Sequence, residues 1–446
     1  MKSLSLISLG CDKNLVDSEV VLGKLLSSQY KIITTPETAD LIIVNSCCFI
    51  DEAIQETESW INRLVQIKNN DPSKTLVVMG CYPQRFGNQL PSKYPEVDFW
   101  IGVNDFPFIN EILTRRGKNQ VLIDKPSYLY DDSTERLLST PSHYAYLKIT
   151  EGCNHHCSYC VIPLIRGKQR SRQMESIQKE IFHLIQQGVK EIILIGQDIG
   201  SYGLDWAGKR MLAQLLRILD QSLLPEGIWI RLLYLSPDSI DPELIETIAT
   251  SKKICKYLDV PLQHIHPDIL QNMNRSSDID KILKNLNTLR QAIPGLFLRT
   301  TLMVGFPGET DFIFNQMVTQ IKSFRFERLG CFIYSPQSGT IASQMPHQVE
   351  EEIKQARYQK IMKIQEKIAS DFHRSLIGNS LEVILDQTPL SQKEPIYLGR
   401  TYGDAPDVDG QIKVNIKTNS KNFQPGNIIK VTVTKSTPYD LEGVYS

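Results

Sequence analysis

Short apolar runs alternate with amphipathic segments through the first part of this 446-residue chain. The β-rich runs are residues 4–9, 41–44 and 76–79, and the segments with helical spacing are residues 15–26 and 53–67. After the third run we expect a Pro-containing loop. This alternation is typical of a parallel sheet with helices between its strands, and it predicts an open parallel α/β domain over residues 1–117.

A cysteine follows each of these three runs, at Cys11, Cys47 and Cys81. In open α/β sheets the carboxyl ends of the strands line one crevice, so residues far apart in sequence converge there. The chain has nine cysteines. In a reducing compartment such thiols serve as ligands, nucleophiles or buried apolar residues rather than as disulfides. We therefore expect the three strand-end cysteines to come together.

The rest of the chain divides into a linker and two further domains. Residues 118–138 are polar and predict the linker. Residues 139–372 hold a second series of strands and helices, with strands at 146–149, 191–195, 228–233, 257–261, 297–304 and 328–334 and a long charged helix at 350–375. Six units predict a partial barrel rather than a closed eight-stranded one. Residues 373–446 contain alternating strands at 381–385, 412–416 and 428–433, which predict a small all-β barrel or sandwich.

Composition and charge exclude several classes of protein. With 41% apolar and 22% charged residues the chain is not disordered. Its formal charge of -1 gives no global basic field for nucleic acid or anionic lipid. No apolar run reaches the roughly 18 residues of a membrane helix, and the apolar part of MKSLSLISLGC is too short for a signal sequence. We expect a cytoplasmic protein without membrane contact or strong nucleic-acid binding.

The strongest chemical signal is the C-x3-C-x2-C spacing of Cys153, Cys157 and Cys160. Three thiolates on a short loop can hold three irons of a cubane cluster and leave one iron open, whereas a closed structural site normally has four ligands. The alternative is a zinc site that takes His155 or His156 as its fourth ligand. In that case the chain would be a zinc-binding scaffold protein rather than an enzyme.

The segment EGCNHHCSYCVIPLIRGKQRSR around these cysteines resembles the cluster-binding loop of the radical S-adenosylmethionine (SAM) methylthiotransferase family. The resemblance implies that Cys153, Cys157 and Cys160 hold a 4Fe-4S cluster whose open iron is chelated by SAM. Electrons from a low-potential donor would then cleave SAM to a deoxyadenosyl radical. Tyr159 has the place of an aromatic residue near the adenine. Radical chemistry without sulfur insertion, such as dehydrogenation or isomerisation, is the rival enzymatic activity.

Four further segments resemble successive strand-end motifs of the family barrel: GQDIGSYG, LDVPLQH, RTTLMVGFPGET and YSPQSGT. Glycines let the backbone approach a nucleotide, and polar side chains at strand ends offer hydrogen bonds to it. For any one of these residues, loop structure or a satisfied polar group in the core is an equally open interpretation. Together the motifs predict the cofactor-binding residues Gln197, Asp198, Gln263, Arg299, Gly305, Gly308 and Glu309.

The family also holds a second 4Fe-4S cluster, here called the auxiliary cluster, on three N-terminal cysteines. The resemblance assigns it to Cys11, Cys47 and Cys81, within SLGCDKNLVDSE, NSCCFI and GCYPQR. Cys48 competes with Cys47, but the usual family motif has its ligand at the place of Cys47. We expect Cys48, Cys255 and Cys331 to be small buried apolar residues. The basic run at residues 166–172 is either a solvated face or a site for anionic groups of cofactor or substrate.

Two branches of this family share the architecture. One modifies an adenosine beside the tRNA anticodon, and the other adds a methylthio group to an aspartate β-carbon of ribosomal small-subunit protein S-twelve. SLGCDKNLVDSE, Asp198 and LGRTYGDAPDVDG resemble the protein-modifying branch and imply a TRAM-like C-terminal barrel.

The charge of the C-terminal domain bears on the substrate as well. Residues 376–446 carry seven lysines and arginines against eight aspartates and glutamates, whereas an RNA-binding barrel should be basic. We therefore expect S-twelve as substrate and partner, with tRNA as the alternative. Asp404, Asp407 and Asp409 are predicted to form a docking loop for this basic protein, unless they form only a solvated surface loop.

Overall fold

The computed structural model describes residues 2–28, 30–115, 117, 119–222, 224–389, 396–416 and 423–445. These residues form two compact units. The first comprises Met1–Ser139, Thr150–Ile177 and Ser335–Ser343, and the second comprises Thr140–Ile149, Gln178–Tyr334 and Gln344–Ser446. The units therefore cut across the predicted domains, because the loop with Cys153, Cys157 and Cys160 belongs to the same unit as the N-terminal sheet.

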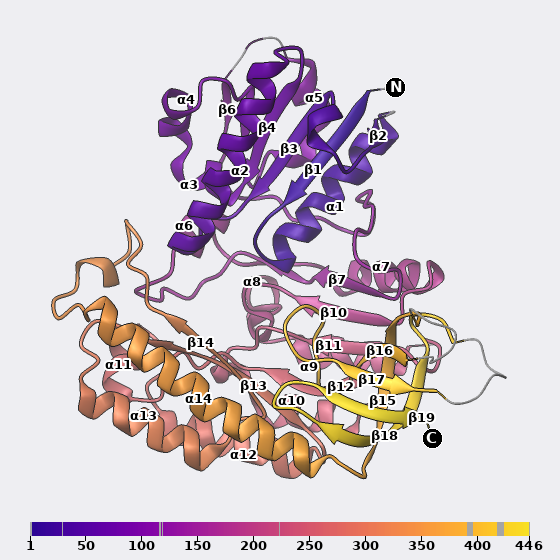
Figure 1. The fold of residues 1–446 in the computed structure, drawn as a ribbon, viewed down its shortest axis with the longest axis vertical. Coiled ribbons are helices and arrows are strands. Elements are labelled where there is room, and N and C mark those ends of the chain that lie inside the picture. Colours follow the sequence, from indigo (N-terminus) through magenta and orange to yellow (C-terminus); the bar gives the residue numbers. More distant parts are fainter. Residues whose placement is uncertain are drawn as a thin grey trace. The chain divides into compact units, whose positions relative to one another are not determined.

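The described part of the first unit contains a six-stranded parallel sheet in the order β2-β1-β3-β4-β5-β6 (Figure 1). The strands are β1 (Ser3–Ser8), β2 (Lys31–Ile32), β3 (Leu41–Ser46), β4 (Thr75–Gly80), β5 (Phe99–Ile101) and β6 (Gln120–Leu122). The helices are α1 (Asp12–Ser27), α2 (Asp51–Asn70), α3 (Cys81–Phe86), α4 (Leu90–Lys93), α5 (Ile109–Thr114) and α6 (Ile162–Arg166). The predicted open parallel sheet is confirmed.

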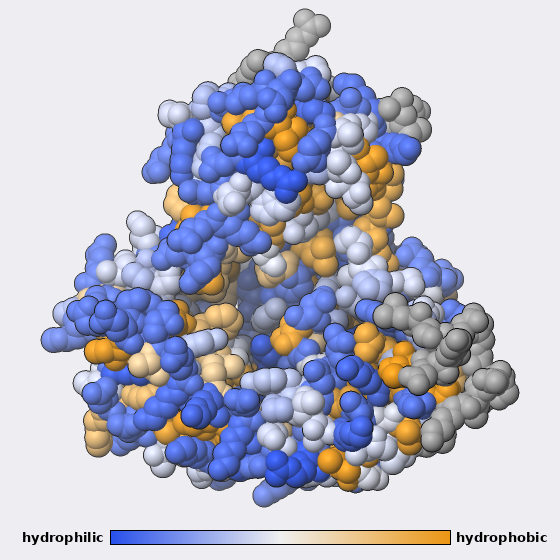
Figure 2. Space-filling view, viewed as in Figure 1, coloured by the Kyte–Doolittle hydropathy of each residue, from blue (hydrophilic) through white to orange (hydrophobic). Residues whose placement is uncertain are grey.

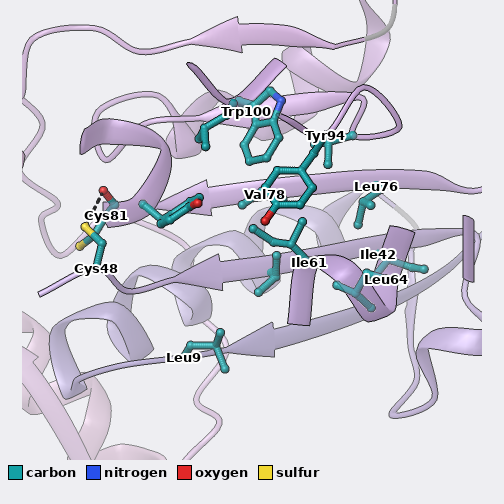
Figure 3. Packing of buried hydrophobic residues seen from close by; sticks show 14 of the residues in the cluster. Leu9, Ile42, Cys48, Ile61, Leu64, Leu76, Val78, Cys81, Tyr94 and Trp100 are labelled. Atoms are coloured by element: carbon teal, nitrogen blue, oxygen red, sulfur yellow. Dashed lines mark hydrogen bonds between the residues drawn. The ribbon is translucent and has the colours of Figure 1, made fainter. Parts of the chain in front are cut away.

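The strands of this sheet are apolar on both faces because helices cover both. Ile42, Leu76 and Val78 face one side, where they pack with Ile61 and Leu64 of α2 (Figure 3). Their sequence neighbours face the other side and pack with α1 and α5; they are Leu41, Ile43, Val77 and Met79. Period-two alternation with burial on both faces explains why these strands are nearly continuous apolar runs.

Two local expectations for this unit were wrong. The segment after β4 is not a loop but helix α3, with Pro83 in its first turn. The first four N–H groups of a helix have no intrahelical partner, so a proline there costs no hydrogen bond. The predicted linker also contributes the edge strand β6, which pairs with β5.

The second unit contains, among its described residues, a six-stranded parallel sheet in the order β14-β13-β12-β11-β10-β7 (Figure 1). The strands are β7 (Tyr144–Lys148), β10 (Glu191–Ile195), β11 (Trp229–Leu232), β12 (Ile254–Asp259), β13 (Phe297–Val304) and β14 (Arg328–Ile333). The helices are α8 (Leu204–Ala207), α9 (Leu212–Gln221), α10 (Pro242–Thr250), α11 (Pro267–Asn272), α12 (Ile279–Ala292), α13 (Asp311–Phe324) and α14 (Glu351–Ser375), while α7 (Met174–Gln186) spans the boundary between the units. This is the predicted partial barrel, with β14 and β7 as its edges.

The C-terminal segment forms a closed barrel from the described strands β15-β16-β17-β19-β18, so the predicted barrel is confirmed. The strands are β15 (Ser380–Gln387), β16 (Ile396–Thr401), β17 (Ile412–Asn415), β18 (Ile428–Ser436) and β19 (Leu441–Tyr445). Sequence analysis missed β16 and β19 because Gly399 and Gly443 interrupt their apolar alternation. Lys393, Glu394, Lys417 and Lys421, which entered the charge count, lie outside the described residues.

The predicted acidic docking loop is wrong for two of its three residues. Asp404 is 2% exposed and accepts a hydrogen bond from Arg328 on β14. The Asp409 side chain is also buried; it accepts a hydrogen bond of 2.8 Å from the Tyr257 hydroxyl and lies 3.7 Å from Nε of Arg299. Burial raises the pKa of Asp409. These carboxylates therefore attach the C-terminal barrel to the parallel sheet and are not free to bind a substrate.

The surface of each unit is mainly polar. Figure 2 shows hydrophilic residues over most of the visible face, with apolar residues in smaller groups between them. Among the helices that the structure describes, none is both long and apolar enough to cross a membrane.

The ion pair between Asp404 and Arg328 leads to a prediction about stability. Asp404→Ala should lower the free energy of unfolding by about 3 kcal/mol, because the buried Arg328 guanidinium loses the carboxylate that pairs with it. Asp407→Ala is the matched control, since this exposed carboxylate accepts only a long hydrogen bond of 3.3 Å from Tyr144; it should change stability by less than about 0.5 kcal/mol. Urea unfolding followed by circular dichroism measures both. Equal losses would show that burial of Asp404 does not matter.

Candidate functional site

Three cysteines stand at the carboxyl ends of adjacent strands of the first unit. Cys11 follows β1 and caps α1, Cys47 follows β3, and Cys81 is the first residue of α3 after β4. The sheet order places β1 between β2 and β3, so the chain direction across the sheet reverses at β1. Ligands of open α/β sheets bind at the crevice created by such a reversal. The predicted convergence of the cysteines thus coincides with the switch point of the sheet.

The buried Asn14 side chain joins these three strand ends. Its Nδ2 donates hydrogen bonds of 3.1 Å to the carbonyl of Leu9 and 3.0 Å to the carbonyl of Ser46. Its Oδ1 accepts from the Cys81 thiol at 3.5 Å. One amide therefore fixes the turns that carry Cys11 and Cys47 and contacts the third thiol. Asn14 is not among the residues predicted from the sequence, where the only indication of its role is its position one helical turn after Cys11.

Glycines precede two of the cysteines because the turns leave no room for a side chain. Gly10 has φ +88°, and a Cβ there would lie 2.7 Å from the Cβ of Cys47. Gly80 has φ +97°, and a Cβ there would lie 2.3 Å from Oδ1 of Asn45. Positive φ and close backbone approach both favour glycine. The Gly-Cys pairs in the sequence are therefore a requirement of the site.

The two adjacent cysteines, Cys47 and Cys48, have different surroundings. Cys48 is fully buried in the apolar cluster of Figure 3, and its Sγ donates a hydrogen bond of 3.2 Å to the carbonyl of Cys81. Burial raises the pKa of the Cys48 thiol. Cys47 instead lies against the turn of Gly10, and the pKa of its thiol is raised by burial and by the nearby Cys11. Cys255 and Cys331 are buried, as expected.

A buried arginine lies against one of these thiols. Nη2 of Arg166 donates to Sγ of Cys81 at 3.3 Å, and Nη1 donates to Oδ2 of Asp17 at 2.7 Å. Burial raises the pKa of the Cys81 thiol to about 12, while the charge of Arg166 opposes this shift. The two ends of the basic run are thus not solvated: Arg166 and Arg172 are 3% and 2% exposed, whereas Lys168 between them is exposed. Arg172 donates to Ser176 and lies over the Tyr130 ring.

The loop with the second cysteine triad is closed at its base by the short antiparallel strands β8 (Thr150–Glu151) and β9 (Arg170–Ser171). The Cys153 N–H donates to the carbonyl of Gly167 at 3.1 Å, which completes the closure. Backbone N–H groups of His155 and Ile162 donate to the sulfurs of Cys153 and Cys160, each at 3.4 Å. Such donors favour the thiolate form.

The segment Ser335–Ser343 links this loop to the N-terminal sheet within the first unit. The Ala342 N–H donates to the carbonyl of Ser158 at 2.8 Å. The Asp51 carboxylate accepts from Ser335 at 2.7 Å and from Gln337 at 2.9 Å. The two thiol triads therefore belong to one hydrogen-bonded unit, although Cys81 and Cys153 lie 72 positions apart in the sequence.

Each triad offers three thiols, which is the donor set that three irons of a cubane cluster take. Among the described residues, no three His, Cys, Asp or Glu side chains are grouped as one metal ion requires. A cubane needs no such point of convergence, because each of its thiolates binds a different iron. Three cysteines on three turns or on one open loop match that requirement and leave a fourth iron for another ligand.

The predicted cofactor-binding residues of the second unit lie near strand ends, with one exception. Gln197 follows β10, Gln263 follows β12 with φ +69°, and Gly305 and Gly308 follow β13 with φ +75° and +84°. Arg299 instead lies near the amino end of β13, where its guanidinium donates to Asp259 at 2.9 Å. The placement of Arg299 at a strand end was therefore wrong, because the motif that contains it spans the whole strand.

Two predicted cofactor contacts have internal partners. Oδ1 of Asp198 accepts from the backbone N–H groups of Gly200 and Ser236, at 3.0 and 3.1 Å. Oε1 of Glu309 accepts from the Gly305 N–H at 3.0 Å and from Arg357 at 2.7 Å. Both carboxylates hold strand-end turns through these bonds, and their contact with a cofactor stays a prediction. Tyr159, Gln197 and Gln263 are half-buried and stay predictions.

Family models match each of the three predicted domains of the chain. Residues 147–321 match the radical SAM superfamily, residues 3–102 match the uncharacterized protein family UPF0004, and residues 377–445 match the TRAM domain. Among curated proteins, the chain is 44% identical over 446 residues to the ribosomal protein uS12 methylthiotransferase RimO of Geotalea uraniireducens, covering 99% of this chain and 98% of the relative. The protein of the same name from Clostridium kluyveri is 42% identical over 450 residues, covering 99% and 97%.

Solved structures resemble the fold at much lower identity. The radical SAM methyltransferase TsrM from Kitasatospora setae, solved with tryptophan and a SAM analogue, aligns with a TM-score of 0.55 and 16% identity, covering 74% of this chain and 73% of that one. This likeness concerns the fold alone.

The Gly80 turn gives a test of the first triad. Gly80→Ala should release iron from the N-terminal cysteines, because the new Cβ meets Asn45 in a backbone conformation, φ +97° and ψ −144°, that by itself costs an L-residue about 1–3 kcal/mol. About half of the iron should remain, on the second triad. Gly188→Ala is the control, since Gly188 has φ +99° but nothing within 4 Å of the added Cβ. Iron and sulfide quantification after anaerobic reconstitution measures both; equal iron contents would contradict the packing argument.

A second pair of variants tests the choice between adjacent thiols. Cys47→Ala should lose iron from the N-terminal triad, whereas Cys48→Ala should keep it, because Cys48 points into the apolar cluster. The same iron assay and the visible absorption of the reconstituted protein distinguish them. Loss of iron from the Cys48 variant alone would reverse the assignment.

Proposed function

The chain belongs to the RimO family of ribosomal protein uS12 methylthiotransferases, and on that premise we propose that it methylthiolates an aspartate β-carbon of uS12, the ribosomal small-subunit protein S-twelve. SAM would serve as radical source and methyl donor. The observation that carries the proposal is the presence of two thiol triads in one compact unit. One triad suits a cluster that binds SAM, and the other suits a cluster that holds the sulfur to be transferred.

When bound, the clusters and SAM supply the radical and the methylthio group; the protein supplies placement and protection. Backbone N–H donors hold the sulfurs of Cys153 and Cys160 on the closed loop. Asn14 and the glycine turns hold the other triad at the switch point of the sheet. These fixed groups need no rearrangement when charge moves at the sulfurs, which is the condition for electrostatic preorganisation.

The proposed substrate has consequences for partners and location. Because reductive cleavage of SAM needs electrons, a low-potential electron donor is required. Since uS12 is a ribosomal protein, we place the activity in the cytoplasm. The nearly balanced charge of residues 376–446 supports a protein substrate over tRNA, because phosphate neutralisation supplies most of the affinity for RNA.

The substrate can be tested directly by mass. Reduced, reconstituted protein and SAM are incubated separately with uS12 and with tRNA. We expect uS12 to gain the mass of one methylthio group on an aspartate and tRNA to remain unchanged. Modification of tRNA alone would overturn the proposal, and a product that lost hydrogen without gaining sulfur would indicate a different radical reaction.

The two triads should have separable roles. Cys153→Ala, Cys157→Ala and Cys160→Ala should each abolish deoxyadenosine formation, because the cluster whose open iron SAM would chelate is lost. Cys11→Ala and Cys81→Ala should keep deoxyadenosine formation and lose methylthio transfer. Chromatography of deoxyadenosine, with iron content as the control for the remaining cluster, measures this. Undiminished SAM cleavage in any of the first three variants would contradict the assignment of Cys153, Cys157 and Cys160 to the cluster that binds SAM.

A further inference from the structure

Arg166 connects the two thiol triads through its side chain. It ends helix α6, six residues after Cys160 on the loop of the second triad. Its Nη2 nevertheless donates to Sγ of Cys81 in the first triad, at 3.3 Å. The same nitrogen donates to Oδ1 of Asn14, the amide that joins the strand ends. A cation from one triad's loop thus lies against a sulfur of the other.

The surroundings of Arg166 hold its guanidinium in one orientation. Nη1 lies 2.7 Å from Oδ2 of Asp17 on α1 and 3.5 Å from Oε1 of Glu151 on β8. The side chains of Arg166, Asp17 and Glu151 are 3%, 2% and 7% exposed, so water screens these charges little. A buried arginine needs such partners to offset its desolvation. Only part of its positive charge is therefore felt at Cys81.

We propose that Arg166 is a positioning residue that raises the reduction potential of the auxiliary cluster through its hydrogen bond and charge on the Cys81 sulfur. This rests on the proposed function, in which Cys81 ligates that cluster. Hydrogen bonds and net charge at the cysteine sulfurs are among the factors that set the potential of an iron–sulfur cluster. A positive charge at the sulfur stabilises the reduced cluster, which carries one more electron. Arg166 thereby influences which of the two clusters a given donor reduces first.

The neighbouring Arg85 provides a matched control. It lies on α3, the helix of Cys81, but its Nη1 donates to the carbonyl of Cys48 at 2.9 Å and to Gln337 at 2.8 Å. It therefore places a cation beside the cysteine that is not expected to bind iron. A purely structural contribution of an arginine in this region would be shared by both residues, whereas an effect on the potential should be specific to Arg166.

The test is a redox titration of the auxiliary cluster followed by electron paramagnetic resonance. The full-length Cys153→Ala variant is used as background, so that the auxiliary cluster is observed alone. Arg166→Gln should lower its potential; a tenfold change in the one-electron equilibrium corresponds to about 59 mV. Arg166→Lys, which keeps the charge, should give a smaller shift. Asp17→Asn should raise the potential, because it removes a carboxylate that offsets Arg166, and Arg85→Gln should leave it unchanged.

Several results would overturn the proposal. An unchanged potential in Arg166→Gln with full iron content would do so, as would equal shifts in the Arg166 and Arg85 variants. If Arg166→Gln fails to hold the cluster, the Arg166→Lys and Asp17→Asn variants decide, and unchanged potentials in both reject the idea. The titration needs no uS12, so a failure of the proposed substrate and a failure of this inference are distinguishable.

Discussion

The hydrogen bonds of one buried amide, Asn14, determine how the first unit presents its cysteines. Strands β1 and β3 are adjacent in the sheet, and Asn14 lies 32 positions before its acceptor Ser46 at the end of β3. By donating to Leu9 and Ser46, Asn14 fixes the two turns at the switch point with respect to each other. Its oxygen contacts Cys81, so the third turn is fixed as well. Without this amide, three turns would be free to diverge.

In the same region, bringing the three cysteines together is not sufficient to form three thiolates. Three thiolates close together repel one another, and burial penalises each charge. The raised pKa values of the Cys47 and Cys81 thiols express that cost. Arg166 and the metal that such thiolates bind both act in the opposite direction, because each brings positive charge to the sulfurs. The arginine comes from the other triad's loop, so the assembly of the two sites is linked.

Much of this arrangement could be predicted from the sequence, because strand-end cysteines and β-rich runs are local signals. The range 191–195 and the range 297–304 were predicted with the bounds of β10 and β13. The contacts that complete the site could not be predicted, because they join distant segments. Nothing in the sequence around Asn14 distinguishes it from any other polar residue of a helix. Arg166 pairs with Asp17, 149 positions away, and its local sequence is the same as that of a solvated arginine.

The aspartates of the C-terminal barrel illustrate the same limit and lead to a conclusion about recognition. A charged motif has the same sequence whether its side chains are solvated or buried, and only the residues that pair with them in the fold determine which of the two occurs. Arg328 and Arg299 on the parallel sheet bind Asp404 and Asp409, so the motif GDAPDVDG specifies how the barrel packs on the sheet. A packing arrangement that separated these partners would leave buried charges uncompensated, so the ion pairs favour the observed arrangement over alternatives. The packing of the barrel therefore explains Asp404 and Asp409, and of the three predicted docking residues the exposed Asp407 alone stays a candidate for substrate recognition.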